Sequence, residues 1–153
     1  MAYDALAIKD KVVAAIVAET DNGDALDDFN VYDRDDMPYR TFFPCVIVNP
    51  PTNTLIERYV GGPRGFQLQF NIEMYVTEKH SKTVAGPITY TRNDLIQVYA
   101  EDLENILESI DYSSTATILG IPTTRSMTTE GTDGDHVIYA AQIVYIVSYM
   151  ESD

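Results

Sequence analysis

The stretch "VIYAAQIVYIVSY" (residues 137–149) lies near the end of the chain and decides how the rest of the fold must be arranged. In a β-strand successive side chains point to opposite faces, and here both faces are mostly apolar. One face carries the larger side chains: Val137, Tyr139, Ala141, Ile143, Tyr145, Val147 and Tyr149. The other carries Ile138, Ala140, Gln142, Val144, Ile146 and Ser148. A strand of this kind needs a cover on each side, which the chain itself or a partner must supply.

The size and composition indicate one domain, residues 1–153, built around a single core. No apolar run reaches the roughly 20 residues of a membrane helix, and the N-terminus lacks the basic and apolar segments of a signal peptide. We therefore expect a soluble protein made inside the cell. The single cysteine, Cys45, excludes an internal disulfide and a cysteine-based zinc cluster. Its apolar surroundings, "FFPCVIV", predict a core residue.

The chain is strongly acidic, with a net charge of −14. Half of this charge lies in residues 19–36, where eight carboxylates accompany a single cation, Arg34. Turn-forming residues in the same stretch predict an acidic loop at about residues 20–38. Such a surface repels phosphate, which argues against nucleic-acid binding through a basic patch. The dense carboxylates fit either an ordinary acidic protein or the protein of a salt-adapted host, in which salt screens their repulsion.

Apolar residues at three- and four-residue spacing predict two amphipathic helices, over residues 3–18 and 93–110. In the second helix the apolar stripe consists of Leu95, Tyr99, Leu103, Ile106 and Ile110. Thr91, with Asp94 three residues later, resembles a capping box at the start of this helix.

The segment "FQLQFNIEMYVT" (residues 66–77) alternates apolar and polar residues almost without a break, which predicts a half-buried strand. Residues 55–60 are its expected hairpin partner across the glycine-rich loop 61–65. The remaining expectations are a buried strand at 41–49, short strands at 29–32, 115–119 and 123–129, an irregular connection at 78–92, and a turn "EGTDGD" (130–135). This order predicts an α+β fold, with a mostly antiparallel sheet and two α-helices packed on one face.

The short motifs are more typical of turns and loops than of catalytic, nucleotide-binding or metal-binding sites. A strand follows "GGPRG" (residues 61–65), whereas a nucleotide loop is followed by a helix. The acidic stretches "DRDD" (33–36) and "DGDH" (133–136) lack the spacing of a calcium loop. The two histidines, His80 and His136, accompany no nucleophile elbow and no zinc motif. We expect no enzymatic activity, no cofactor and no metal site.

Tyrosine is abundant, with eleven residues, and three of them share one face of the terminal strand. A side chain with a large apolar body and a polar tip suits a surface that is buried on association. Since two helices cover one side of the sheet, we expect a partner subunit to cover the other. The predicted subunit interface consists of Tyr139, Ile143, Tyr145, Val147 and Tyr149. The alternative is that the acidic loop folds over the uncovered side.

The layout resembles the tail terminator (tail completion) proteins of long-tailed viruses over nearly the whole chain. Five segments carry the resemblance: "ALAIKDKVVAAIVAE", "FPCVIVNPP", "FQLQFNIEMYV", "DLIQVYAEDLENILESI" and "HVIYAAQIVYIVSY". The similarity is one of architecture, since the family has no invariant signature. The acidic insertion at residues 21–36 departs from the family pattern.

The resemblance implies a non-enzymatic virion protein that forms a homohexameric ring at the head-proximal end of the tail. In that family the ring ends tail-tube polymerisation, offers a surface to the head connector or neck protein, and lets DNA pass without specific binding. Assembly takes place in the host cytoplasm, away from membranes. The residues expected to contact the tail tube or connector are Lys79, His80, Lys82 and Arg92. The alternatives are another neck, connector or tail-tube ring protein, and a small-ligand-binding α+β domain.

Overall fold

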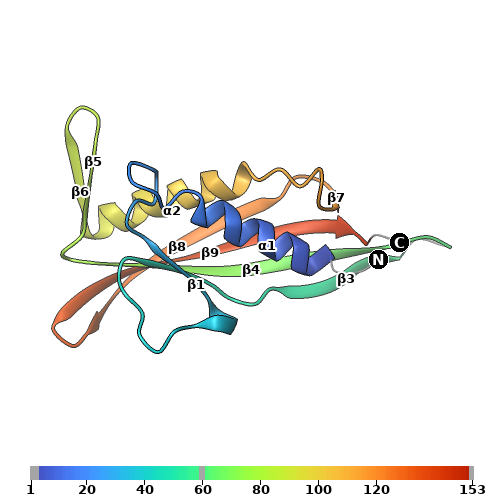
Figure 1. Cartoon of the computed structure of the whole chain (residues 1–153), viewed down its shortest axis with the longest axis horizontal. Helices are drawn as coiled ribbons and strands as arrows, with labels where there is room; N and C mark the ends of the chain where they lie inside the picture. The colour runs from blue at the N-terminus through green and yellow to red at the C-terminus, as the bar shows by residue number, and fades with distance from the viewer. Residues whose placement is uncertain (1–3, 59–60, 152–153) are drawn as a thin grey trace.

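The structure, a computed structural model, describes residues 4–58 and 61–151 and has an α+β architecture. A curled sheet forms one layer, and two helices lie along one of its faces (Figure 1). The helices are α1 (Asp4–Val17) and α2 (Arg92–Glu108). None of the helices in the described ranges combines the length and apolarity that a membrane-spanning helix requires.

Two long antiparallel strands form the middle of the sheet, β4 (Arg64–Thr77) and β9 (His136–Met150). Their pairing runs without a break from Gly65 opposite Met150 to Thr77 opposite Ile138. Because paired residues share a face, the alternation in β4 fixes which side chains of β9 point the same way. The apolar face of β4 therefore continues directly into the tyrosine-bearing face of β9.

Shorter strands extend the sheet on both sides. Beyond β4 lie β2 (Cys45–Val48) and β3 (Thr52–Arg58), and β1 (Asn30–Asp33) pairs with β2. Beyond β9 lie β7 (Thr117–Ile118) and β8 (Thr123–Asp133). The β1–β2 pair is parallel, so the sheet is mixed, although its other pairings are antiparallel. A separate hairpin, β5 (Ser81–Val84) with β6 (Ile88–Thr91), projects beside the start of α2 (Figure 1).

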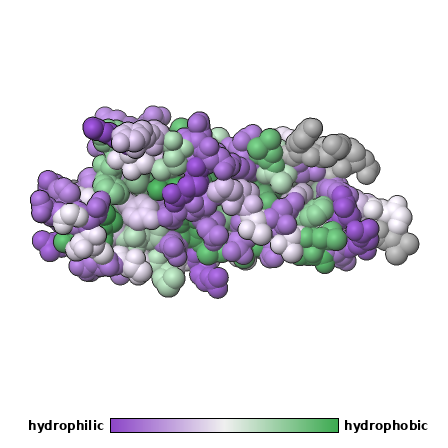
Figure 2. All heavy atoms as spheres, turned by 90° about the horizontal axis from the view of Figure 1, so that it is seen from below, coloured by the Kyte–Doolittle hydropathy of each residue, from purple (hydrophilic) through white to green (hydrophobic). Residues whose placement is uncertain are grey.

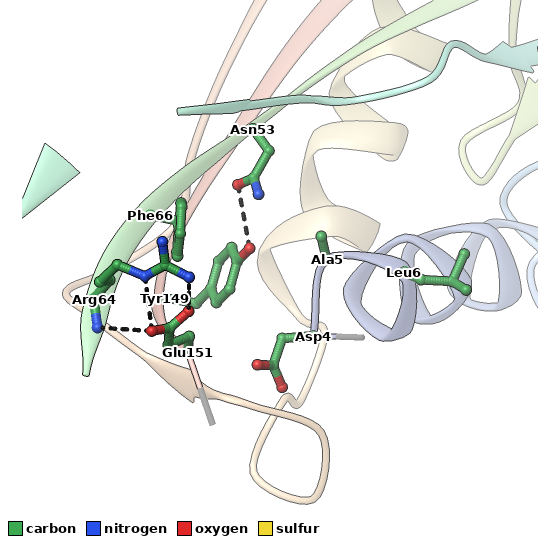
Figure 3. Close-up of a pocket in the computed structure, with 8 residues that line it drawn as sticks. All are labelled: Asp4, Ala5, Leu6, Asn53, Arg64, Phe66, Tyr149 and Glu151. Carbon is green, nitrogen blue, oxygen red and sulfur yellow. Dashed lines mark hydrogen bonds and ion pairs between the residues drawn. The ribbon is translucent and has the colours of Figure 1, made fainter. Parts of the chain in front are cut away.

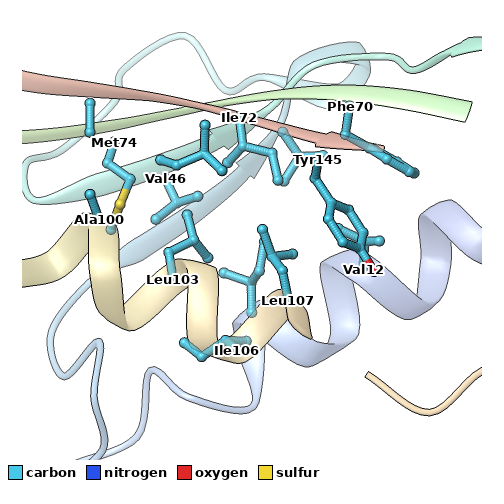
Figure 4. Close-up of a cluster of buried hydrophobic side chains, with 14 of the residues drawn as sticks. Val12, Val46, Phe70, Ile72, Met74, Ala100, Leu103, Ile106, Leu107 and Tyr145 are labelled. Atoms are coloured by element: carbon cyan, nitrogen blue, oxygen red, sulfur yellow. The ribbon is translucent and has the colours of Figure 1, made fainter. Parts of the chain in front are cut away.

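The core lies between the helices and the sheet (Figure 4). Helix α1 contributes Ile8, Val12 and Ile16, which recur every four residues and are fully buried. Helix α2 contributes the first four residues of the predicted stripe, together with Ile96, Ala100 and Leu107. The fifth, Ile110, follows the end of the helix at Glu108 and is only partly buried. From the sheet come Leu68, Phe70, Ile72, Met74 and Val76 of β4 and the alternate residues of β9. Most of the favourable free energy of folding comes from removing this apolar surface from water.

The acidic segment is an integral part of the fold. Leu26 and Phe29 enter the core, where the Phe29 ring meets the Tyr99 ring edge-on at 4.7 Å between centroids. The Lys9 ammonium of α1 lies 3.0 Å from the Asp33 carboxylate and 3.4 Å from that of Asp35. This acidic segment, residues 20–38, is mostly loop with one short strand, as the sequence predicts, and it also contains a short 3-10 helix, η1 (Arg34–Asp36). Leu26, Phe29 and Lys9 attach it to the helices.

Three local expectations were wrong. The predicted irregular connection at residues 78–92 contains the β5–β6 hairpin, whose turn passes through Gly86 at φ +112. The stretch 130–135 is mostly strand, because β8 continues to Asp133 and the chain reverses within Gly134 and Asp135. The capping box is absent, since Arg92 has φ +55 and the Thr91 side chain makes no capping hydrogen bond.

Candidate assembly interface

The predicted interface residues Tyr139, Ile143, Tyr145, Val147 and Tyr149 lie beneath the helices. Each is 3% exposed or less, and all belong to the core. The hydroxyl of Tyr145 is 2.7 Å from that of Tyr112, and the hydroxyl of Tyr149 donates to the Asn53 side chain at 3.2 Å. The prediction that a partner covers this face is therefore corrected. The chain's own helices cover it, because the bulkiest side chains of β9 fill the space between sheet and helices.

The opposite side of the sheet, here called the outer face, remains open to a partner. It consists of Ile138, Ala140, Gln142, Val144 and Ile146 from β9, Gln67, Gln69, Asn71, Glu73 and Tyr75 from β4, and Thr123, Arg125, Met127 and Thr129 from β8. The apolar β9 residues here are only partly buried, and Met127 is 62% exposed. Seen from below in the orientation of Figure 1, the surface is a mixture of hydrophobic and hydrophilic residues (Figure 2).

One end of the outer face is covered by the residues that connect β1 to β2. Arg34 donates to the Glu73 carboxylate at 2.6 Å, and Asn49 donates to the same oxygen at 2.6 Å. Tyr75 donates to the other oxygen of that carboxylate. Beside them Ile47, which points to the outer face, is only 7% exposed. The acidic segment therefore covers the outer face near β2 and leaves β4, β9 and β8 accessible.

The Glu73 carboxylate is held in its charged form. Burial alone would raise its pKa, but hydrogen bonds from Tyr75, Asn49 and Arg34, together with the Arg34 charge, hold the pKa below its usual value. Burial and the adjacent Glu73 carboxylate raise the pKa of Tyr75 to about 12. At neutral pH the cluster therefore contains a carboxylate, a guanidinium and a neutral phenol. It stabilises the fold, and its one negative charge is paired.

Two hollows adjoin each other on the outer face. The first, of about 330 Å³, is lined by Asn49, Asn71, Glu73, Gln142 and Val144 among others. The second, of about 410 Å³, is lined by Arg125, Ser126, Met127, Gln142 and Val144. Because they share Gln142 and Val144, they form one shallow depression across β4, β9 and β8. A concave surface of partly exposed apolar and amide side chains suits contact with another protein surface.

The charge of the outer face differs from that of the chain as a whole. The chain carries −14, yet the outer-face residues named above include only two charged side chains, Glu73 and Arg125. Glu73 is neutralised by Arg34, at the covered end of the face. Depletion of charged residues is the compositional mark of the centre of a protein interface. Arg125 is exposed, and among the outer-face residues named it is the charge that takes part in no ion pair of the described residues. Asp133 and His136 lie on the same side of the sheet, at the far end of β8 and β9.

The four residues predicted to contact the tube or connector divide into two pairs. Lys82 is bound within the chain, to the Asp102 carboxylate at 2.7 Å and the Ala25 carbonyl at 3.0 Å, and its ammonium lies 5.1 Å from the centre of the Tyr99 ring. His80 accepts a hydrogen bond from the Thr77 N–H at 2.9 Å, and burial lowers its pKa. Lys79 and Arg92, by contrast, are exposed near the β5–β6 hairpin.

Cys45 and His136 make contacts within the fold. Cys45 is buried, and burial raises the pKa of its thiol to about 12. His136 approaches the Glu78 carboxylate at 3.2 Å, next to the β8–β9 turn. In the described ranges no three histidine, cysteine or carboxylate side chains gather as metal ligands.

A further hollow, of about 340 Å³, lies at the end of the sheet where α1 begins (Figure 3). Arg64 donates two hydrogen bonds of 2.9 Å to the Glu151 carboxylate, and its guanidinium lies 5.3 Å from the centre of the Phe66 ring. The Phe66 ring stacks on Tyr149 at 5.7 Å. These polar groups bind one another, which leaves Leu6 as the exposed large apolar side chain of the hollow.

No protein-family model matches this chain, and no curated protein matches it. The candidate site therefore depends on the geometry alone. The sequence prediction placed the interface on the face of β9 that the chain's own helices bury. The residues it missed are Val144 and Ile146 of β9 with Arg125 and Met127 of β8. The polar residues of β4, among them Gln67, Gln69 and Asn71, indicate which side of the sheet faces solvent. Which residues of β9 lie on that side can be deduced only from the β4–β9 register, which the sequence does not give.

Proposed function

We propose that this protein is a non-enzymatic ring subunit of a viral tail, a tail terminator that ends tube polymerisation and joins the tube to the head connector or neck protein. The observation that carries the proposal is the open outer face, where partly exposed apolar residues of β9 lie among amide and hydroxyl side chains. A surface of this kind is stable in water when a neighbouring subunit covers it. The architectural resemblance of the sequence supplies the identity of the assembly.

The charge distribution supports the proposed environment. With a net charge of −14, a ring of such subunits presents negative walls to DNA, which passes without binding. The exposed cations Lys79 and Arg92 are then the residues available to an acidic surface of the tube or connector. The proposed location is the tail or neck of the virion, after assembly in the host cytoplasm.

The proposal is tested by measuring the mass of the purified protein by light scattering, at low and at molar salt, followed by negative-stain imaging. A hexameric ring has six times the subunit mass of 17.1 kDa and appears as single rings. Molar salt should favour assembly, because it screens the repulsion between subunits of charge −14. Long cylinders would indicate a tube protein. A monomer or dimer at both salt concentrations would contradict the proposal and favour a ligand-binding domain.

A further inference from the structure

Helix α1 presents a second apolar stripe to solvent, opposite the stripe in the core. The buried stripe consists of Ile8, Val12 and Ile16. The outward stripe consists of Leu6, Asp10, Ala14, Val17 and Ala18, all exposed. Leu6 is 55% exposed and Val17 is 47% exposed. A surface helix normally carries polar residues on its outward side. Here only Asp10 of the outward stripe is charged, and the exposed Leu6 and Val17 are the apolar surface that a neighbour would cover.

A groove adjoins this stripe between α1 and the C-terminal end of α2. Its volume is about 350 Å³, and its apolar lining comes from Ala14, Ala15, Ala18, Ile106 and Ile110. Lys11, Glu19, Ser109 and Asp111 complete the lining and give the groove polar and charged side chains as well. The three alanines leave the space that longer side chains would fill. The groove therefore accepts a slender apolar side chain from outside, and methionine, which is unbranched, suits such a gap.

The outward stripe and the outer face carry single charges of opposite sign. Asp10 is the only charged residue of the outward stripe, and Arg125 is the only unpaired charge among the outer-face residues named above. Both are exposed, and within the described residues neither takes part in an ion pair. A charge set in an apolar surface is stabilised when an opposite charge docks against it.

The residues that would meet are also similarly spaced on the outer face and on the outward stripe. Arg125 and Met127 are two residues apart on a strand, which separates them by about 6.6 Å. Asp10 and Ala14 are four residues apart on a helix, which separates them by about 6 Å along its axis. When Arg125 faces Asp10 and β8 runs along the axis of α1, Met127 lies over Ala14 at the mouth of the groove.

The geometry points to a head-to-tail contact between copies of this chain, in which the outer face of one subunit packs on α1 of the next. Arg125 pairs with Asp10 of the neighbouring copy, and Met127 enters the groove beside Ala14 and Ala18. One chain cannot make this contact with itself, because its sheet and helical layer separate the outer face from the outward side of α1 (Figure 1). The inference rests on the proposed function and deepens it by naming the two surfaces that a closed ring of identical subunits requires.

The first test is a charge exchange. Asp10→Lys and Arg125→Glu each place like charges in contact, so each single variant should weaken self-association at least tenfold in light scattering. The double variant Asp10→Lys/Arg125→Glu restores opposite charges and should recover the assembly. Matched controls are Glu101→Lys on the exposed side of α2 and Arg40→Glu in the loop before β2, both exposed, which should assemble like the wild type. Circular dichroism establishes that every variant is folded.

The second test separates a head-to-tail contact from a symmetric one. Met127→Glu blocks the outer face, and Ala18→Glu blocks the groove, so each variant alone should be monomeric. Mixed together, each still offers one intact surface, and the mixture should stop at pairs with twice the subunit mass of 17.1 kDa. If only the outer-face variants lose assembly, two outer faces pack on each other and the inference is overturned.

The outcomes also distinguish the inference from the proposed function. Wild-type rings that persist in both Asp10→Lys and Arg125→Glu overturn the inference and leave the ring proposal standing. Wild-type filaments that both substitutions abolish support the contact and overturn the proposal of a closed terminator ring. A wild-type protein that stays monomeric at both salt concentrations overturns both.

Discussion

The two faces of β9 have similar apolar character and different surroundings. Ile143 and Val147 point into the core and are fully buried, whereas Val144 and Ile146, their neighbours in the chain, point to the outer face and are only partly buried. Hydrophobicity alone does not separate the two sets. The helices cover one side of the sheet, and on the other side the acidic segment reaches only as far as the Glu73 cluster.

An apolar strand face can therefore stabilise the fold of its own chain or provide a surface for association. Under the helices, burial is complete within one chain, and the side chains contribute directly to the free energy of folding. On the outer face the same residue types contribute less to folding and remain available for association. Substitutions on the two faces should therefore have different consequences for folding and for association.

The difference between the two faces is tested most directly by replacing one isoleucine on each face of β9. Ile143→Ala should lower the free energy of unfolding by about 2–5 kcal/mol, because it creates a cavity in a fully buried site. Ile146→Ala, on the partly buried outer face, should cost about 1 kcal/mol. Urea denaturation at a protein concentration that keeps the chain monomeric measures both. Equal costs would show that the outer face is as well packed as the core.

The second prediction concerns the buried tyrosine pair on the inner face. Tyr145→Phe should cost about 1–3 kcal/mol, because it leaves the Tyr112 hydroxyl buried without its partner at 2.7 Å. Replacing both residues removes both polar groups, so Tyr112→Phe/Tyr145→Phe should be destabilised by less than the sum of the single variants. A double-mutant cycle in urea gives the coupling energy. Strict additivity would mean that the two hydroxyls do not depend on each other.

The third prediction concerns Glu73, the carboxylate at the covered end of the outer face. Its pKa in the folded protein lies below the value of 4.5 that it has when unfolded, so its charged form stabilises the fold. This contribution is present above pH 4.5 and is lost as the pH falls through the lower pKa of the folded state. Glu73→Gln should cost about 1 kcal/mol at neutral pH.

The difference between wild type and Glu73→Gln should stay constant above pH 4.5 and shrink in more acidic solution. Urea unfolding at several pH values measures it. A suitable control is Glu101→Gln, whose side chain is exposed on α2 and should give a small difference at every pH. A difference for Glu73→Gln that does not change with pH would contradict the role assigned to the cluster.

Much of the fold follows from local patterns. The periodicity of α1, α2 and β4 predicts those elements closely, because each buries one regular stripe or face. The β5–β6 hairpin was missed because its residues are mostly polar and short strands carry little periodic signal. The role of Lys82 was missed for another reason, since its partners Asp102 and Ala25 are distant in the sequence.

The amino-acid pattern alone predicts that β9 is a long strand with two apolar faces. It also predicts an acidic α+β chain, and the few motifs in it do not indicate catalysis. Only the tertiary structure decided which face belongs to the core. Alternation fixes the residues that share a face, but the register between β4 and β9 and the packing of α1 and α2 choose the side. The same packing leaves Arg125 and Asp10 on opposite sides of the chain, and no local pattern of the sequence relates the two residues, because the contact proposed for them is between copies.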